Sequence, residues 1–102
     1  MTDLRLQYEA AVSELEEKTS SMLVSGVDEE QVACWAVDQR GLLKLKYREL
    51  TPRDALAVIE AWALKRYGNS LGPTVDQLRA RGKSWADIID SAARPGRQPE
   101  GL

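Results

Sequence analysis

Histidine is absent from the 102 residues, and Cys34 is the one cysteine. Structural zinc sites take His and Cys ligands, and the common nucleophilic triads depend on a histidine base. The sequence therefore gives no support for a metal site or for these catalytic groups, and we expect neither a metal nor a cofactor. A single cysteine also forms no disulfide within the chain, which fits a reducing compartment.

Long hydrophobic runs are lacking as well. A membrane-spanning helix needs about 20 mainly apolar residues, and no apolar run approaches that length. The first residues do not show the basic segment and short apolar stretch of a signal peptide. We therefore expect a cytoplasmic protein without a membrane partner.

Phenylalanine is missing too, which leaves Trp35, Trp62 and Trp85 as the bulky residues available to a core. Apolar residues recur at spacings of three and four, and such spacings define the inward faces of amphipathic helices. The core residues that we expect from these faces are Leu15, Val32, Trp35, Ile59, Trp62 and Ile88.

Helical periodicity extends through most of the chain, and no segment alternates in the manner of a β-strand. Thr51-Pro52 and Ser84 are expected to begin helices, and Gly68 and Gly82 are placed to end them. The expected helices cover about residues 3–24, 28–48, 51–67, 74–82 and 84–94. We predict an all-α fold, a compact bundle of about five helices with a long antiparallel pair and three shorter helices. A single domain covers residues 1–94, and residues 95–102 are expected to form a flexible tail.

Charge is distributed unevenly. Residues 1–38 hold nine acids and two bases, and residues 39–102 hold seven acids and twelve bases, so that net charges of −7 and +5 combine to −2. We predict that a basic run in the second part forms a solvent-exposed surface, separate from the acidic helix. This basic surface is expected to bind a partner. The helix dipole alone also favours cations at a helix C-terminus, which leaves a structural role open. The candidate binding residues are Arg40, Lys44, Lys46, Tyr47, Arg48 and Arg66.

Four segments together resemble a known group of proteins: residues 36–40 (AVDQR), 43–52 (LKLKYRELTP), 67–74 (YGNSLGPT) and 82–89 (GKSWADII). They are similar to C-terminal segments of bacterial polymorphic toxins, the contact-dependent or hemagglutinin-type exoproteins whose last domain varies. The resemblance covers about residues 36–96. The chain departs from the family pattern at Arg40-Gly41, where the pattern has Arg-Asn, and at Asn69-Ser70, where it has Asp-Pro. The resemblance implies a toxin-related setting and names no reaction.

Three functions fit these features. The first is a small helical protein-binding module from a bacterial toxin-related system, which docks a charged and apolar helix face on a partner protein. The second is a small nuclease-type toxin whose Arg, Lys and Tyr side chains hold RNA or another phosphate-bearing ligand. The third is a helix-turn-helix DNA-binding regulator over residues 74–92, although Asp87 and Asp90 suit a phosphate-rich groove badly. No residue is assigned a catalytic role, and the amphipathic first helix also allows a homodimer.

Overall fold

The computed structural model describes residues 4–70 and 72–94. The described chain forms helices α1 (Leu4–Val24), α2 (Glu29–Arg48), α3 (Arg53–Tyr67), α4 (Val75–Ala80) and α5 (Trp85–Ala93). No strand occurs among the described residues, and the prediction of an all-α bundle of about five helices is confirmed. The expected tail, residues 95–102, lies outside the described residues. None of the described helices is both long and apolar enough to cross a membrane.

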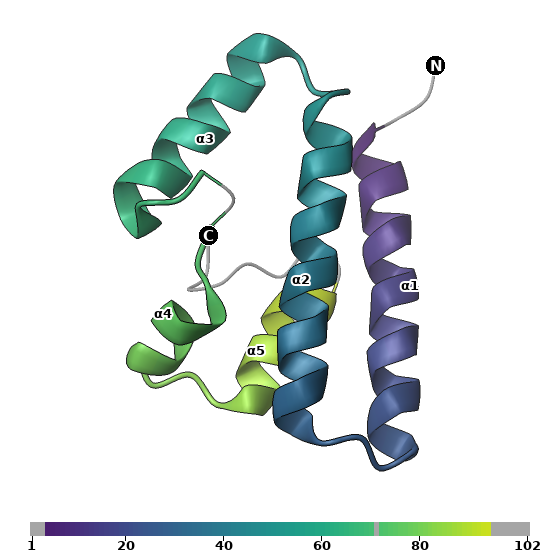
Figure 1. Cartoon of the computed structure of the whole chain (residues 1–102). Coiled ribbons are helices and arrows are strands. Elements are labelled where there is room, and N and C mark those ends of the chain that lie inside the picture. Colours follow the sequence, from purple (N-terminus) through teal and green to yellow (C-terminus); the bar gives the residue numbers. More distant parts are fainter. Residues whose placement is uncertain (1–3, 71, 95–102) are drawn as a thin grey trace.

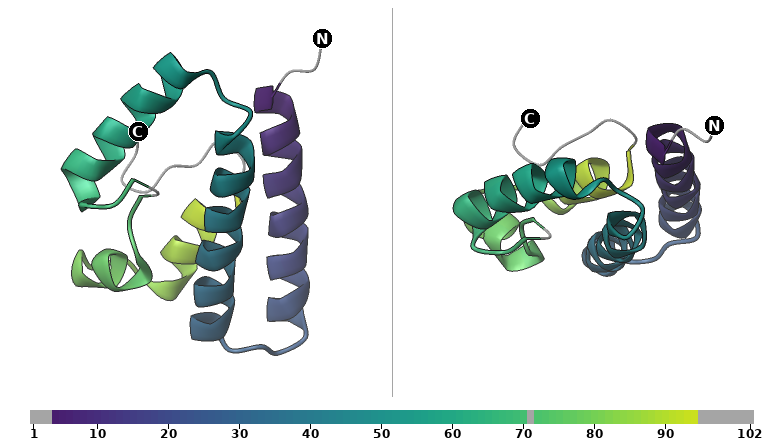
Figure 2. Two further views of the ribbon diagram at one scale, coloured as in Figure 1. Left: turned by 45° about the horizontal axis from the view of Figure 1, so that its top comes forward. Right: turned by 90° about the horizontal axis from the view of Figure 1, so that it is seen from above.

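Helices α1 and α2 form a long antiparallel pair, and α5 packs on this pair (Figures 1 and 2). The most extensive packing joins α2 to α5, followed by α1 to α2 and α1 to α5. Helix α3 leaves the end of α2 and lies on the side of α2 away from α1, as both figures show. Helix α4 then leads the chain back toward α5. The fold is therefore a packed α1–α2–α5 unit with α3 extended at one side.

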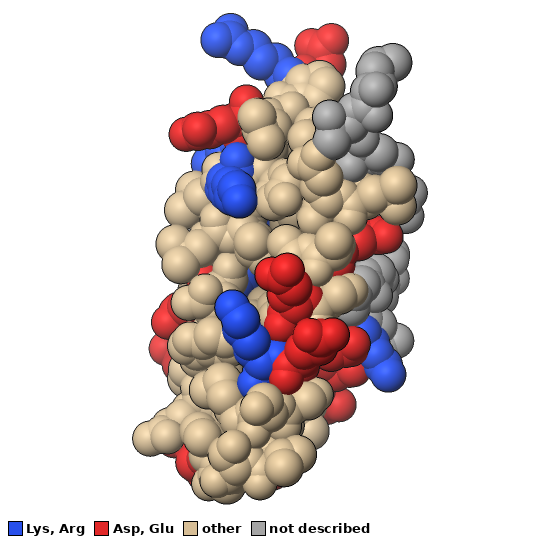
Figure 3. All heavy atoms as spheres, turned by 90° about the vertical axis from the view of Figure 1, so that its right-hand side faces the viewer, with Lys and Arg blue, Asp and Glu red and all other residues tan. Residues whose placement is uncertain are grey.

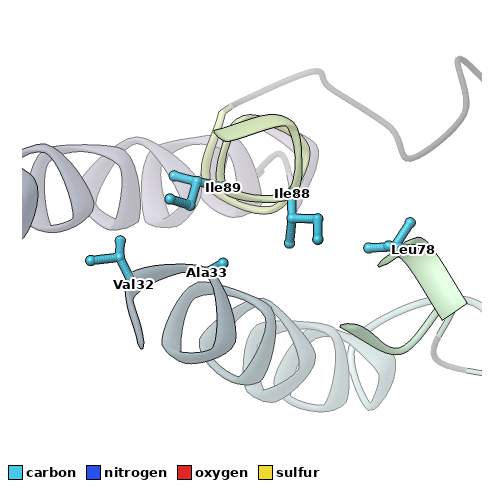
Figure 4. Packing of buried hydrophobic residues seen from close by; sticks show 5 residues of the cluster. All are labelled: Val32, Ala33, Leu78, Ile88 and Ile89. Atoms are coloured by element: carbon cyan, nitrogen blue, oxygen red, sulfur yellow. The ribbon is translucent and has the colours of Figure 1, made fainter. Parts of the chain in front are cut away.

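The core lies where α2, α4 and α5 meet (Figure 4). Val32 is fully buried and Ile88 is 1% exposed, and they share a cluster with Ala33, Leu78 and Ile89. A second cluster contains Leu15, Ala36, Ala92 and Ala93. Alanines in both clusters allow α2 and α5 to approach closely. The predicted burial of Leu15, Val32 and Ile88 is confirmed, and Trp35 is partly buried.

The predicted burial of Ile59 and Trp62 is wrong. Ile59 is 57% exposed and Trp62 is 38% exposed, because α3 does not pack into the α1–α2–α5 unit. Helix α3 itself carries apolar residues on every face, and one of those that point outward is Val58, at 70% exposure. A helix that is apolar all round is normally buried on all sides. The described structure thus leaves an apolar helix only partly covered.

The local signals that end and begin the helices are mostly as expected. Thr74 and Ser84 each form a complete capping box, and Gly68 ends α3 in the left-handed conformation with φ of 69°. Thr51 is an exception, because its hydroxyl donates to the carbonyl of Tyr47 at 2.7 Å instead of capping α3. Pro52 takes the cap position and makes no side-chain bond there. The chain therefore turns sharply between α2 and α3.

Candidate binding groove

A groove separates the C-terminal half of α2 from α3, and it has a volume of about 660 Å³. This size lies within the range of ligand-binding clefts in proteins. The N-terminal part of α1 and the segment after α3 contribute to its edges. Its apolar and aromatic lining includes Leu4, Tyr8, Tyr47, Pro52, Leu56, Ile59, Trp62, Ala63 and Tyr67.

Two edge-to-face aromatic pairs shape the walls of the groove. The rings of Trp62 and Tyr67 lie 5.8 Å apart on α3, and those of Tyr8 and Tyr47 lie 5.4 Å apart between α1 and α2. The two rings of such a pair attract each other, and this attraction adds to the stabilisation that comes from burying their surface. The aromatic walls are therefore held in defined orientations although they face an open groove.

Three cations project from α2 into the groove. Arg40, Lys44 and Arg48 follow one another at intervals of four residues, which places them on one face of the helix at successive turns. Among the described residues that line the groove, Glu60 is the one acid. The groove therefore combines apolar walls with an excess of positive charge.

Arg48 joins α2 to α3 and to the segment that follows it. Its Nε lies 3.2 Å from Oε1 of Glu60, and its Nη2 donates to Oγ of Ser70 at 3.1 Å. Both partners of this ion pair are partly exposed, so it contributes modestly to stability. Its geometric effect is to link α2 with α3 and with the segment that follows α3.

Lys44 lies partly buried beside the segment that follows α3. Burial, and next the positive charge of Arg40, lower the pKa of Lys44 to about 8. Its Nζ lies 3.1 Å from the position that a Cβ atom on Gly72 would occupy. Gly72 is buried and has φ of 102°, a conformation that favours glycine. Lys44 also lines a second cavity, of about 560 Å³, on the side of α4 and α5.

The structure brings together four of the six predicted binding residues. Arg40, Lys44, Tyr47 and Arg48 all line the groove. Lys46 lies outside the lining, with its ammonium 5.7 Å from the ring centre of Tyr47.

Arg66 also lies outside the lining of the groove. Its guanidinium is 5.9 Å from the ring centres of both Trp62 and Tyr67. This cation therefore lies near two aromatic rings of the groove wall without lining the groove itself.

The expectation that the four bases of the run are solvent-exposed is wrong for three of them. Lys46 is exposed, whereas Arg40, Lys44 and Arg48 are partly buried. Each of the three meets a different neighbour: Arg40 bonds to α1 and α5, Lys44 lies beside Gly72, and Arg48 pairs with Glu60 of α3. Acidic side chains gather instead on the opposite side of the molecule, over α1, where basic side chains lie beside them (Figure 3). One such pair joins Glu16 Oε2 to Arg94 Nε at 3.7 Å.

Sequence reasoning missed several residues of the groove. Tyr8 belongs to α1, far away in the sequence, and Ser70 and Gly72 belong to a segment expected to be only a loop. Trp62 lines the groove at a position where the sequence predicts a core residue. One signal was available, because apolar residues on every side of α3 indicate that one of its faces requires an additional partner.

Comparison with known proteins finds no matching family model, no matching curated protein and no matching solved structure.

Proposed function

We propose that the chain is a small protein-binding module whose groove takes an apolar, acidic helix of a partner protein. The observation that carries this proposal is the position of an exposed apolar helix, α3, opposite a stripe of three cations on α2. Amphipathic helices bind other proteins by laying apolar residues into such grooves. The toxin-related setting rests on the resemblance described above.

The apolar part of the partner follows from the groove walls. Ile59 and Trp62 remain exposed at the groove although neighbouring apolar residues of the core are buried. Covering apolar surface contributes about 25 cal/mol per Å². Aromatic anchors of this kind frequently dominate binding energies. A partner that carries apolar residues at spacings of three and four gains this contribution along α3.

The acidic part of the partner follows from charge complementarity. Three cations and one acid line the groove, and that acid, Glu60, already pairs with Arg48. Carboxylates on the partner are attracted by the positive charge of Arg40 and Lys44, which lie at successive turns of α2. They also relieve the repulsion between these two cations, which contributes to the lowered pKa of Lys44.

A display experiment tests the proposal. The full chain is used to select from a library of random peptides of about 15 residues, the length of α3. We expect the selected peptides to combine helical apolar spacing with Asp or Glu. Ile59→Ser is expected to weaken their binding at least tenfold, and Lys44→Gln is expected to weaken it and flatten its salt dependence.

Val24→Ser is the matched control, because Val24 is 89% exposed on α1 and lies outside the groove lining. Its affinity for the selected peptides should equal that of the unaltered chain. The proposal is contradicted if the selected peptides are basic or uncharged. It is also contradicted if Ile59→Ser and Val24→Ser weaken peptide binding equally.

A nuclease-type toxin is the second candidate, because Tyr47 lies beside Lys44 and Arg48 in the same groove. Positive charge there can stabilise a phosphoryl transition state. Cleavage of RNA by the purified chain, lost in Lys44→Ala and Arg48→Ala but retained in Lys46→Ala, supports this candidate. The helix-turn-helix alternative gains less support, since α5 buries Ile88, Ile89, Ala92 and Ala93 in the core and leaves Asp87 exposed.

A further inference from the structure

Lys44 stands at the boundary between two cavities. It lines the groove beside α3 and also the second cavity beside α4 and α5, and Arg40, Gly72 and Pro73 share both linings. Its Nζ lies beside Gly72, 3.1 Å from the position that a Cβ atom on that residue would occupy. A small molecule in either cavity therefore meets the same amine.

The surroundings of Lys44 favour a neutral amine. Burial removes water from the ammonium, and Arg40 adds a like charge one turn away, so that the pKa falls to about 8. Desolvation and a neighbouring cation are the two means by which proteins make a lysine nucleophilic. Other charged or titratable groups that line the two cavities are Tyr8, Tyr47, Arg48, Glu60, Tyr67, Cys34, Asp38 and Asp76.

We propose that Lys44 is a carbonyl-binding amine, which forms an imine with an aldehyde or ketone that carries an acidic group. The carbonyl compound reaches Lys44 through the groove, and the apolar part of the compound packs against the aromatic walls of the groove. Arg40 and Arg48 lie four residues before and after Lys44, about 6 Å along the helix in each direction. Their positive charge therefore flanks Nζ on both sides and attracts the acidic group, in addition to the bonds of Arg40 with Tyr8 and Ala92 and of Arg48 with Glu60 and Ser70.

The reaction needs no further reactant. The lone pair of the neutral amine forms a bond to the carbonyl carbon, and the π electrons of the carbonyl group move to its oxygen. A proton then passes from nitrogen to that oxygen, which gives a carbinolamine. Loss of the hydroxyl group with a second proton from nitrogen releases one water molecule and leaves the C=N bond. Addition of water reverses these steps.

This inference does not depend on the docking of a partner helix. A protein that binds peptides in the groove without forming an imine refutes only the carbonyl proposal. A protein that forms the imine and selects no peptide refutes only the docking proposal.

Reductive trapping tests the proposal in the full chain. The protein is incubated at pH 7.5 with 4-carboxybenzaldehyde and cyanoborohydride, and peptide mass spectrometry follows the labelling of each lysine. At this pH about a quarter of an amine with a pKa of 8 is neutral, against about one in a thousand for an ordinary lysine. The lower basicity of Lys44 makes its neutral amine less nucleophilic, which removes part of this advantage. We therefore expect Lys44 to be labelled at least tenfold faster than the exposed Lys46 and Lys65.

Two control reactions separate the effect of the fold from that of the acidic group. In urea-unfolded chain the preference for Lys44 should vanish, because its surroundings are lost. Benzaldehyde, which lacks the acid, should label Lys44 in the folded chain several-fold more slowly than 4-carboxybenzaldehyde. Labelling of Lys44 at or below the rate of Lys46 overturns the carbonyl proposal, and equal rates for the two aldehydes overturn the requirement for an acidic group.

Discussion

Nε of Arg40 donates a hydrogen bond to the hydroxyl oxygen of Tyr8 at 2.7 Å, which ties α2 to α1. Nη1 of the same guanidinium donates to the carbonyl oxygen of Ala92 at 2.7 Å and so ties α2 to α5 as well. One side chain of the groove lining therefore holds the three packed helices together. Arg40 consequently has a structural role in addition to any contact with a ligand.

Arg40→Ala is expected to lower the free energy of unfolding by about 2–3 kcal/mol, since hydrogen bonds from a charged group contribute more than neutral ones. Tyr8→Phe removes one acceptor and is expected to cost about 1 kcal/mol. Urea denaturation followed by circular dichroism measures both changes. Lys46→Ala, at an exposed position of the same helix, should change stability by less than about 0.5 kcal/mol. Equal losses at positions 40 and 46 contradict the assignment.

Ile88→Ala is expected to cost about 2–5 kcal/mol, because Ile88 is 1% exposed and its truncation leaves a cavity between α2 and α5. Ile59→Ala deletes the same atoms at a position that is 57% exposed. We expect this second change to stay below about 1 kcal/mol. The pair is compared in one urea series, and a similar cost at both sites is incompatible with an α3 that lies outside the core.

Lys44→Met is expected to stabilise the chain at pH 7. The folded state lowers the pKa of Lys44 to about 8 from 10.5, so it disfavours the charged form that Lys44 carries at neutral pH. Between pH 8 and 10.5 the unfolded chain binds more protons than the folded chain, and stability conferred by Lys44 rises with pH. The advantage of methionine should therefore be greatest below pH 8 and decrease toward pH 10.5.

Urea midpoints of the two proteins at pH 7, 8, 9 and 10 measure this difference. All other side chains are the same in the two proteins, so their contributions cancel in the comparison. A difference in stability that is constant across these pH values shows that Lys44 keeps its ordinary pKa in the folded chain.

Gly72→Ala should destabilise the chain more than Gly68→Ala. Both glycines have positive φ, which costs an alanine about 1–2 kcal/mol. A Cβ at Gly68 meets open space, whereas one at Gly72 comes within 3.1 Å of Nζ of Lys44 and forces the side chain to move. Thermal midpoints of the two variants give the comparison, and an equal shift shows that the contact with Lys44 adds nothing.

Helix positions and the core of the packed unit could be predicted from the sequence because both depend on local signals. The capping boxes at Thr74 and Ser84 lie within four residues of chain, and spacings of three and four place Val32 and Ile88 inward. These patterns constrain the fold strongly when a helix has one apolar face.

The groove could not be predicted in the same way. The sequence shows the cations of the groove as a basic run on one helix. How far these side chains are buried depends on the angle at which α3 leaves α2. The turn at Thr51 and the contacts of Arg48 accompany that angle, and no local pattern predicts them. Helix α3 has no single apolar face, so periodicity assigned Ile59 and Trp62 to a core that they do not reach. The contribution of Tyr8 requires the packing of α1 on α2, which no local pattern contains.

Because α3 packs sparsely on the rest of the chain, we expect it to unfold locally at a lower free energy than the α1–α2–α5 unit. The α1–α2–α5 unit shares buried clusters, whereas most apolar side chains of α3 are exposed and only Ala63 and Tyr67 of this helix are buried among the described residues. Segments with few buried apolar contacts open at a lower free energy than the core, and their amide hydrogens exchange sooner. We therefore expect α3 to open more readily than the packed unit, so that a ligand which binds one separation of α2 and α3 better than others shifts the population toward it without unfolding that unit.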